Sequence, residues 1–222
     1  MLGYTVVAGC SNIAVGQMCA YHKFPNYFPE TGLPISESEW NLIRTVESYN
    51  NGVYNAGSNN AKNLVCLVIS DLGKGNKSSW GIKQTSTSRA NVCRYLLRLG
   101  YSNVSTFNYS HGGISTMLAS GYPVLVRGDK IVSSNDDMDG ELADHMWVID
   151  GYGSVASLTG SSRISLVHCN FGWGGIADGW YTSGIFELYG SRWMHDQNVG
   201  DNIGVQNDYY QYNLKYIFYV LP

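Results

Sequence analysis

Hydrophobic residues recur at helical spacing through the first half of the chain. This spacing predicts helices over residues 10–22, 36–49, 61–72, 88–99 and 114–119. Ser36 followed by Glu39 is the pattern of a capping box, so one helix is expected to begin there. Gly73 and Gly100 each follow a hydrophobic segment and are expected to end the helices before them.

The pattern changes after residue 120 to short apolar runs separated by turn residues. These runs predict strands over 123–127, 146–150, 165–169, 179–181, 184–188 and 216–220, with Gly151 ending the second. The remaining turn-rich segments, 23–34, 50–60, 74–87, 128–144 and 190–207, are predicted loops. Helices followed by strands indicate the α+β class. We expect a single domain over 1–222, with a mainly helical lobe over 1–120 and a mainly β lobe over 121–222.

Composition narrows the function classes. The 222 residues carry a net charge of -3, and only 14% of them are charged, which leaves no electrostatic footprint for nucleic acid or an anionic membrane. No apolar run approaches the ~20 residues needed to span a bilayer. The segment before the first helix is too short and too uncharged to be a signal peptide, so an exported protein would have a leader absent from this sequence.

The cysteines argue against a structural zinc site. Five are present, at 10, 19, 66, 93 and 169, and none forms a CxxC pair. A Cys66–Cys93 disulfide stays open beside the default expectation of free, buried thiols. No metal site and no cofactor are expected.

Cys10 stands where a sulfur nucleophile is expected. Gly9 allows a sharp turn into the helix, and Ser11 and Asn12 are expected to satisfy amides of its first turn. A thiol at the start of a helix faces the positive end of the helix dipole, which favours the thiolate. The alternative is a cysteine packed in the core.

His145 is the best candidate for the base that such a thiol needs. It opens a predicted strand directly after an acidic loop that ends at Asp144, whereas the other histidines lie in a helix, a strand interior or loops. Downstream, Asn170 is placed to accept an imidazole N–H, and Trp173 to cover the ring. The alternative is a structural histidine beside a glycine-rich turn with an aromatic plug. Cysteine, histidine and asparagine in this order are typical of papain-like catalysis.

At these residues the chain resembles the streptopain family of papain-like cysteine peptidases. The resemblance lies in three ordered motifs: Ala8-Gly9-Cys10 with Gln17-Met18-Cys19-Ala20-Tyr21-His22, then His145-Met146-Trp147-Val148-Ile149-Asp150-Gly151, then Asn170-Phe171-Gly172-Trp173-Gly174-Gly175. It implies a papain-like two-lobed fold whose C-terminal lobe is an antiparallel sheet or barrel. It also implies Cys10 as nucleophile, His145 as general acid and base, and Asn170 and Trp173 as supporting residues.

Two positions depart from the family pattern. Papain-like enzymes place a glutamine six residues before the nucleophile as an oxyanion donor, and Tyr4 stands there in this chain. The oxyanion donors expected here are therefore the Cys10 amide and Tyr4. Phe171 replaces the first tryptophan of the glycine-rich motif, which keeps an aromatic surface but loses the indole N–H.

The resulting hypothesis is a secreted, cell-surface or periplasmic bacterial cysteine endopeptidase acting on protein or peptide substrates. A pro-segment or a proteinaceous inhibitor is a possible partner; nucleic acid and a membrane span are not expected. The alternative is a catalytically impaired papain-like binding or inhibitory module, which Tyr4 and Phe171 motivate. Acyl transfer of the transglutaminase or amidase kind is a third reading with the same chemistry.

Overall fold

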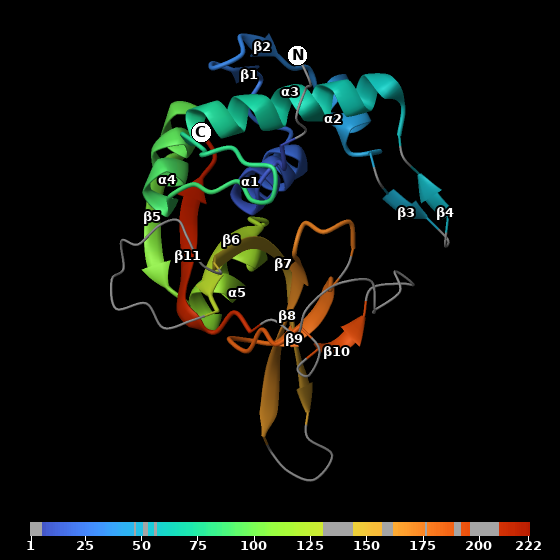
Figure 1. Ribbon diagram of the computed structural model, residues 1–222. Helices are drawn as coiled ribbons and strands as arrows, with labels where there is room; N and C mark the ends of the chain where they lie inside the picture. The colour runs from blue at the N-terminus through green and yellow to red at the C-terminus, as the bar shows by residue number, and fades with distance from the viewer. Residues whose placement is uncertain are drawn as a thin grey trace. The chain divides into compact units, whose positions relative to one another are not determined.

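The computed structural model describes residues 6–46, 48–50, 53–55, 57–130, 144–156, 162–175, 177–188, 192–195 and 209–222 (Figure 1). The chain forms two compact units. The first comprises the described residues up to Ser105 together with Tyr219–Pro222, and the second comprises those from Thr106 to Phe218. Helices dominate the first and an antiparallel sheet dominates the second, so the α+β class is confirmed.

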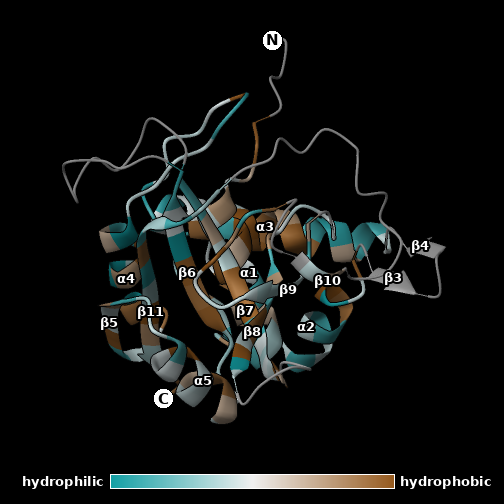
Figure 2. Cartoon of the chain, turned by 90° about the horizontal axis from the view of Figure 1, so that it is seen from below, coloured by the Kyte–Doolittle hydropathy of each residue, from teal (hydrophilic) through white to brown (hydrophobic). Residues whose placement is uncertain are grey.

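The first unit holds four helices and two small hairpins within its described residues. Its elements are α1 (Cys10–His22), β1 (Tyr27–Phe28), β2 (Leu33–Pro34), α2 (Glu37–Ile43), β3 (Ser48–Asn50), β4 (Val53–Asn55), α3 (Asn59–Gly75) and α4 (Arg89–Arg98). Helix α1 contributes Ala14, Val15 and Met18 to the core and contacts α3. Figure 2 shows both hydrophobic and hydrophilic stretches along α3, as expected of a helix with one packed face. Two predicted loops, 23–34 and 50–60, contain strands of these hairpins.

The starts of α1, α2 and α4 follow the sequence, whereas α3 begins at Asn59 instead of residue 61 and α5 at His111 instead of residue 114. Two helix ends also differ. Ser36 and Glu39 form the expected capping box at α2, but α2 ends at Ile43 instead of residue 49. The predicted stop at Gly73 is also wrong, because α3 continues to Gly75. A Cβ at Gly73 would lie 1.9 Å from the Trp80 ring, so this glycine permits close packing rather than ending the helix.

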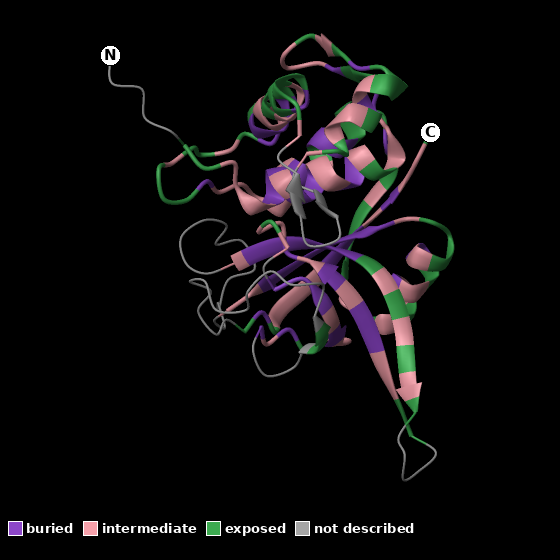
Figure 3. Cartoon of the chain, turned by 90° about the vertical axis from the view of Figure 1, so that its right-hand side faces the viewer, coloured by how far each residue is buried: buried purple, intermediate pink, exposed green. Residues whose placement is uncertain are grey.

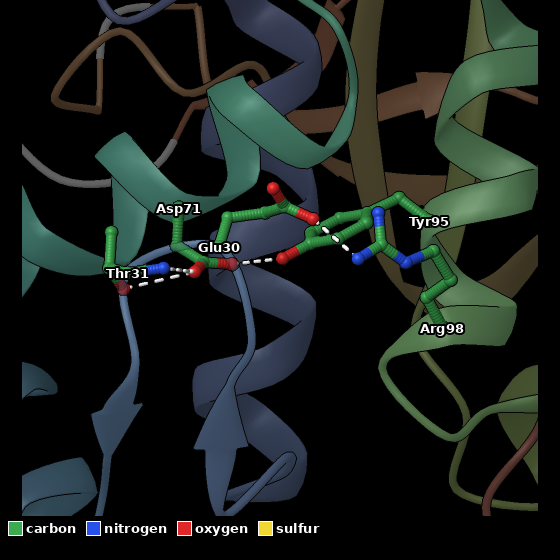
Figure 4. Close-up of polar contacts among 5 residues, drawn as sticks. All are labelled: Glu30, Thr31, Asp71, Tyr95 and Arg98. Atoms are coloured by element: carbon green, nitrogen blue, oxygen red, sulfur yellow. Dashed lines mark hydrogen bonds and ion pairs between the residues drawn. The ribbon is translucent and has the colours of Figure 1, made fainter.

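A buried carboxylate ties three parts of the first unit together (Figure 4). Asp71 of α3 accepts hydrogen bonds from the Thr31 amide at 2.7 Å and the Thr31 hydroxyl at 2.9 Å. It also accepts one from the Tyr95 hydroxyl of α4. Beside it, Arg98 forms an ion pair with Glu30 at 2.6 Å. The three hydrogen bonds to Asp71 satisfy a carboxylate that has no exposed surface, as a buried charge requires.

One sheet runs through the second unit. Its strands and the accompanying helix are β5 (Ser102–Asn108), α5 (His111–Ala119), β6 (Val124–Asp129), β7 (Asp144–Ala156), β8 (Arg163–Asn170), β9 (Gly179–Thr182), β10 (Arg192–His195) and β11 (Tyr212–Val220). Among the described residues seven strands pair in the order β10-β9-β8-β7-β6-β11-β5. Strands β5 and β11 each include residues of both units. The long β7–β8 hairpin is buried at the β6 side and increasingly exposed toward its tip (Figures 1 and 3).

Three details of the sheet differ from expectation. Strand β7 does not end at Gly151 but continues to Ala156, after a register shift between Ile149 and Gly151. Strand β5 was not predicted, because its polar, largely exposed residues give no apolar run. The predicted strand at 184–188 is reduced to one bridge, Glu187 with Tyr209.

The two long predicted loops of this half fall largely outside the described residues. These loops are 128–144 and 190–207, of which 131–143, with Asp136, Asp137, Asp139 and Glu141, and also 190–191 and 196–207 lie outside the described residues. Gly128 and Asp129 belong to β6 and Asp144 belongs to β7, so the loop prediction is wrong at these positions. Strand β10 lies within the second predicted loop, so that prediction is wrong for Arg192–His195.

Candidate active site

Cys10 is the first residue of α1, as predicted, and its side chain is partly exposed. A first-turn N–H has no acceptor within its own helix, so the Cys10 amide points out of the helix start together with the dipole. The Ile13 amide donates to Gly9 O at 3.1 Å, which closes the first turn. The thiol and this amide are therefore held side by side at the helix tip.

A clamp around Thr85 fixes the segment that leads into α1. The Thr85 hydroxyl donates to Val7 O at 2.6 Å and accepts from the Gly81 amide at 3.2 Å. Val7 in turn donates to Gly81 O at 3.1 Å. Gly9 has a φ of 84°, and a Cβ there would lie 3.0 Å from both Thr85 Cγ2 and Thr85 O. Gly9 is thus required by its backbone angle and by its neighbour.

Asn12 supports the helix start differently from the prediction. No side chain caps the start of α1, where Gly9 is the N-cap residue, so the expected capping by Ser11 and Asn12 is wrong. The Asn12 amide group instead donates to Ala8 O at 2.8 Å and to Ser78 Oγ at 3.1 Å, and Asn12 Oδ1 accepts from Asn76 at 2.8 Å. Asn12 and Asn76 are each 1% exposed. This buried polar cluster holds the carbonyl two residues before Cys10.

The other cysteines have ordinary or unfavourable surroundings for a nucleophile. All five cysteines are free, so the structure contains no Cys66–Cys93 bridge, and Cys66 is exposed rather than buried. Burial raises the pKa of Cys19 to about 12 and raises the pKa of Cys169 well above its usual range. Both of those thiols are inert at neutral pH.

His145 lies in β7 of the second unit, opposite Gly128 of β6. Its imidazole is surrounded by aromatic rings, with centroid distances of 4.5 Å to Trp173, 5.3 Å to Tyr210, 5.8 Å to Phe171 and 6.2 Å to Trp147. The Trp147 and Phe171 rings lie within 15° of parallel to it, at 11° and 14°. The side chain is 4% exposed. The ring is therefore held in one orientation by packing.

One hydrogen bond fixes the tautomer of this imidazole. His145 Nε2 lies 2.9 Å from Phe171 O. A carbonyl oxygen only accepts, so Nε2 carries the proton in this bond. In the neutral ring the basic lone pair is then on Nδ1. Orienting a histidine through a backbone carbonyl on one nitrogen leaves the other nitrogen to exchange protons.

The imidazole N–H that Asn170 was expected to accept is bound by Phe171 O instead, and Asn170 acts on the same peptide group. It is the last residue of β8, and its Oδ1 accepts from the Gly172 amide at 3.0 Å. That amide and the Phe171 carbonyl belong to one peptide bond, so the carboxamide and the imidazole bind opposite ends of it. Hydrogen bonds in such a chain polarise one another. Gly172 has a φ of 77°, which this tight turn requires.

Asp144 precedes His145, and its carboxylate forms an ion pair with Arg127 of β6. Arg127 is 7% exposed, so its charge is balanced inside the unit.

The geometry can be compared with known proteins at this point. The model of the Peptidase C10 family matches residues 2–181, a range that contains Cys10, His145, Asn170 and Trp173. The chain belongs to the Peptidase C10 family. The members of this family are cysteine-type peptidases.

Curated relatives agree with this family. Streptopain from Streptococcus pyogenes serotype M1 is 25% identical over 204 residues, which cover 81% of this chain and 46% of the relative. Streptopain from Streptococcus pyogenes is 25% identical over 203 residues with the same coverage. The chain therefore spans about half the length of the curated relatives it matches.

Tyr4, which the sequence suggested as an oxyanion donor of this C10 family member, lies outside the described residues. The part of the chain that the structure describes contains no group of three or more histidine, cysteine, aspartate or glutamate side chains suited to a metal ion. None of its helices is both long enough and apolar enough to cross a membrane.

Several supporting residues of this C10 family member were missed in the sequence. Thr85, Asn76 and Ser78 hold the segment before Cys10 from loops more than sixty positions away. Asp178 binds the Phe171 amide. Only the last could have been found, as an acidic residue closing the glycine-rich motif that follows Asn170.

Proposed function

We propose that this chain is a cysteine endopeptidase in which Cys10 is the nucleophile and His145 the general acid and base. The observation that carries the proposal is the fixed His145 imidazole, whose Nε2 is bound to Phe171 O at 2.9 Å, so that Nδ1 is the nitrogen able to exchange a proton. The partly exposed Cys10 thiol at the start of α1 and the family membership support the same roles. Asn170 and Trp173 are proposed as positioning residues.

The chemistry follows from these groups. His145 Nδ1 takes the thiol proton, and the Cys10 thiolate attacks the carbonyl carbon of a peptide bond. The Cys10 amide, and the Tyr4 hydroxyl in this proposal, donate hydrogen bonds to the oxyanion that forms. The imidazolium then protonates the leaving amine as the C–N bond breaks. A water molecule, deprotonated by His145, releases the acyl group from sulfur and restores the thiol.

The aromatic rings around His145 contribute to this scheme. The Trp173 indole lies 4.5 Å from the imidazole, centroid to centroid, and is tilted by 33°. An aromatic face stabilises a neighbouring cation by its quadrupole, and it excludes water from a developing imidazolium. Phe171 binds His145 through its backbone carbonyl. The replacement of the family's tryptophan by phenylalanine therefore leaves this hydrogen bond in place.

We further propose that residues 1–222 form a papain-like domain with two lobes, secreted by a bacterium. Its substrates are proteins or peptides, with a pro-segment or a proteinaceous inhibitor as further partner. Similarity to the streptopains supports these assignments.

The test is hydrolysis of denatured casein by the full chain and by three variants. We expect activity in the wild type and in the matched control Cys66→Ala, which removes an exposed thiol on α3. Cys10→Ala and His145→Ala are expected to lose at least about a thousandfold in rate, because nucleophile and base act as a unit. Undiminished hydrolysis by Cys10→Ala would contradict the proposal.

Two other outcomes identify the alternatives. A wild type that hydrolyses nothing, while Cys10→Ala still binds a protein partner, would indicate a binding or inhibitory module. Exchange of an amine into a glutamine peptide without casein hydrolysis would indicate acyl transfer. Phe171 is the described departure that motivates the first alternative, and its retained carbonyl contact with His145 argues against it.

A further inference from the structure

Asp178 and His145 bind the same residue from opposite sides. Asp178 lies just before β9, is 6% exposed, and accepts a hydrogen bond from the Phe171 amide through Oδ1 at 2.8 Å. The Phe171 carbonyl accepts the bond from His145 Nε2 at 2.9 Å. The backbone of one residue therefore links a buried carboxylate to the imidazole.

The loop that carries Phe171 needs such an anchor. Four of its described residues have positive φ: 77° at Gly172, 66° at Gly174, 91° at Gly175 and 65° at Ala177. Glycines impose no single backbone conformation, so the path of this loop depends on its contacts. The Tyr181 hydroxyl donates to Ala177 O at 2.5 Å, and the Asp178 amide donates to Gly175 O at 3.3 Å. The Asp178 carboxylate adds the contact to the Phe171 amide.

We propose that Asp178 is a positioning residue for His145: its carboxylate holds the Phe171 backbone so that the Phe171 carbonyl keeps the proton on Nε2 and the lone pair on Nδ1. A carboxylate suits this role because it only accepts, and its bonds to backbone amides are about twice as strong as neutral ones. An asparagine at the same place is able to turn its NH₂ group toward the amide and lose the contact. The expected effect of Asp178 on catalysis rests on the proposed function, whereas its expected effect on the His145 tautomer does not.

The test combines nuclear magnetic resonance of the imidazole with kinetics. In a Cys10→Ala background the ¹⁵N signals of His145 are recorded at a pH where the ring is neutral, with and without Asp178→Ala or Asp178→Asn. We expect the parent to hold one tautomer, with the proton on Nε2, and Asp178→Ala to show a mixture. Asp150→Asn is the matched control, because Asp150 is a carboxylate of the same sheet that pairs with His168, at 2.5 Å.

In the background with Cys10 present, we expect Asp178→Ala to lower kcat/KM by about tenfold or more, a part of what a positioned general base contributes. The basic limb of its pH profile should also move to lower pH, because a carboxylate no longer supports the imidazolium. Asp178→Asn should fall between Asp178→Ala and the wild type, and Asp150→Asn should leave both readouts within twofold.

The proposal is overturned if the parent already holds the proton on Nδ1, a result that requires no Asp178 variant to fold. It is also overturned if either Asp178 variant folds and leaves the His145 tautomer unchanged. These outcomes concern the imidazole alone. A failure of the proposed function would show separately, as casein hydrolysis that persists in Cys10→Ala.

Discussion

Gly9 illustrates how one residue controls the geometry before the nucleophile. Its φ of 84° is unfavourable for any residue with a Cβ, and the space where a Cβ would lie is already in contact with Thr85. Gly121 has a similar φ of 80°, but no atom lies within 4 Å of its Cβ position. Comparing the two separates backbone strain from contact.

Gly9→Ala is expected to be more destabilising than Gly121→Ala. Both variants pay about 1–2 kcal/mol for the left-handed backbone, and Gly9→Ala adds the displacement of Thr85. Unfolding by urea, followed by circular dichroism, measures both free energies. If the two variants lose equal stability, the contact between Gly9 and Thr85 has no energetic role.

Helix α1 ends at a histidine whose environment overrides the helix dipole. A positive charge is favoured at the C-terminus of a helix, yet burial lowers the pKa of His22 to about 4. His22 Nε2 lies 3.0 Å from the Tyr219 hydroxyl, and the two rings meet edge to face at 5.7 Å. The folded first unit therefore favours the neutral imidazole.

The stability of the protein should depend on pH through His22. Between a pKa of about 6.5 in the unfolded chain and about 4 in the folded one, the unfolded state binds the proton more tightly. Acidification through this window therefore lowers stability, by about 1–2 kcal/mol once the partial exposure of the ring is allowed for. His22→Gln should flatten this part of the curve, measured by urea unfolding from pH 4 to pH 8. An unchanged slope in His22→Gln would contradict the shifted pKa.

At the scale of elements, the capping box of α2 was predictable, whereas the cap of α1 and the ends of α2 and α3 were not. Ser36 and Glu39 form a local capping box that the sequence spells out. By contrast, Gly73 looked like a stop because glycine often ends helices, but its lack of a side chain serves packing against Trp80. Strand β5 was missed for a related reason: its residues are polar and its place is set by pairing at the sheet edge. Tertiary contact decides in both cases.

At the scale of the whole molecule, the order of motifs was enough to find the family and to nominate the chemical groups. Cys10 at the start of a helix and His145 in a strand followed from local patterns. The contacts that hold them did not. Thr85 and Asn76 reach the Cys10 segment across long stretches of sequence, and the acceptor for His145 is a backbone carbonyl, which no sequence pattern marks. That Cys10 and His145 act as a pair stays a prediction.

The most direct test of that pairing is the rate at which iodoacetamide alkylates each cysteine at pH 6, followed by peptide mass spectrometry in the wild type and in His145→Ala. Cys66 is the internal reference, because it is a free and exposed thiol. We expect Cys10 to react at least about tenfold faster than Cys66 in the wild type and to lose this advantage in His145→Ala. Equal rates for Cys10 and Cys66, or a fast Cys10 that persists without His145, would contradict it.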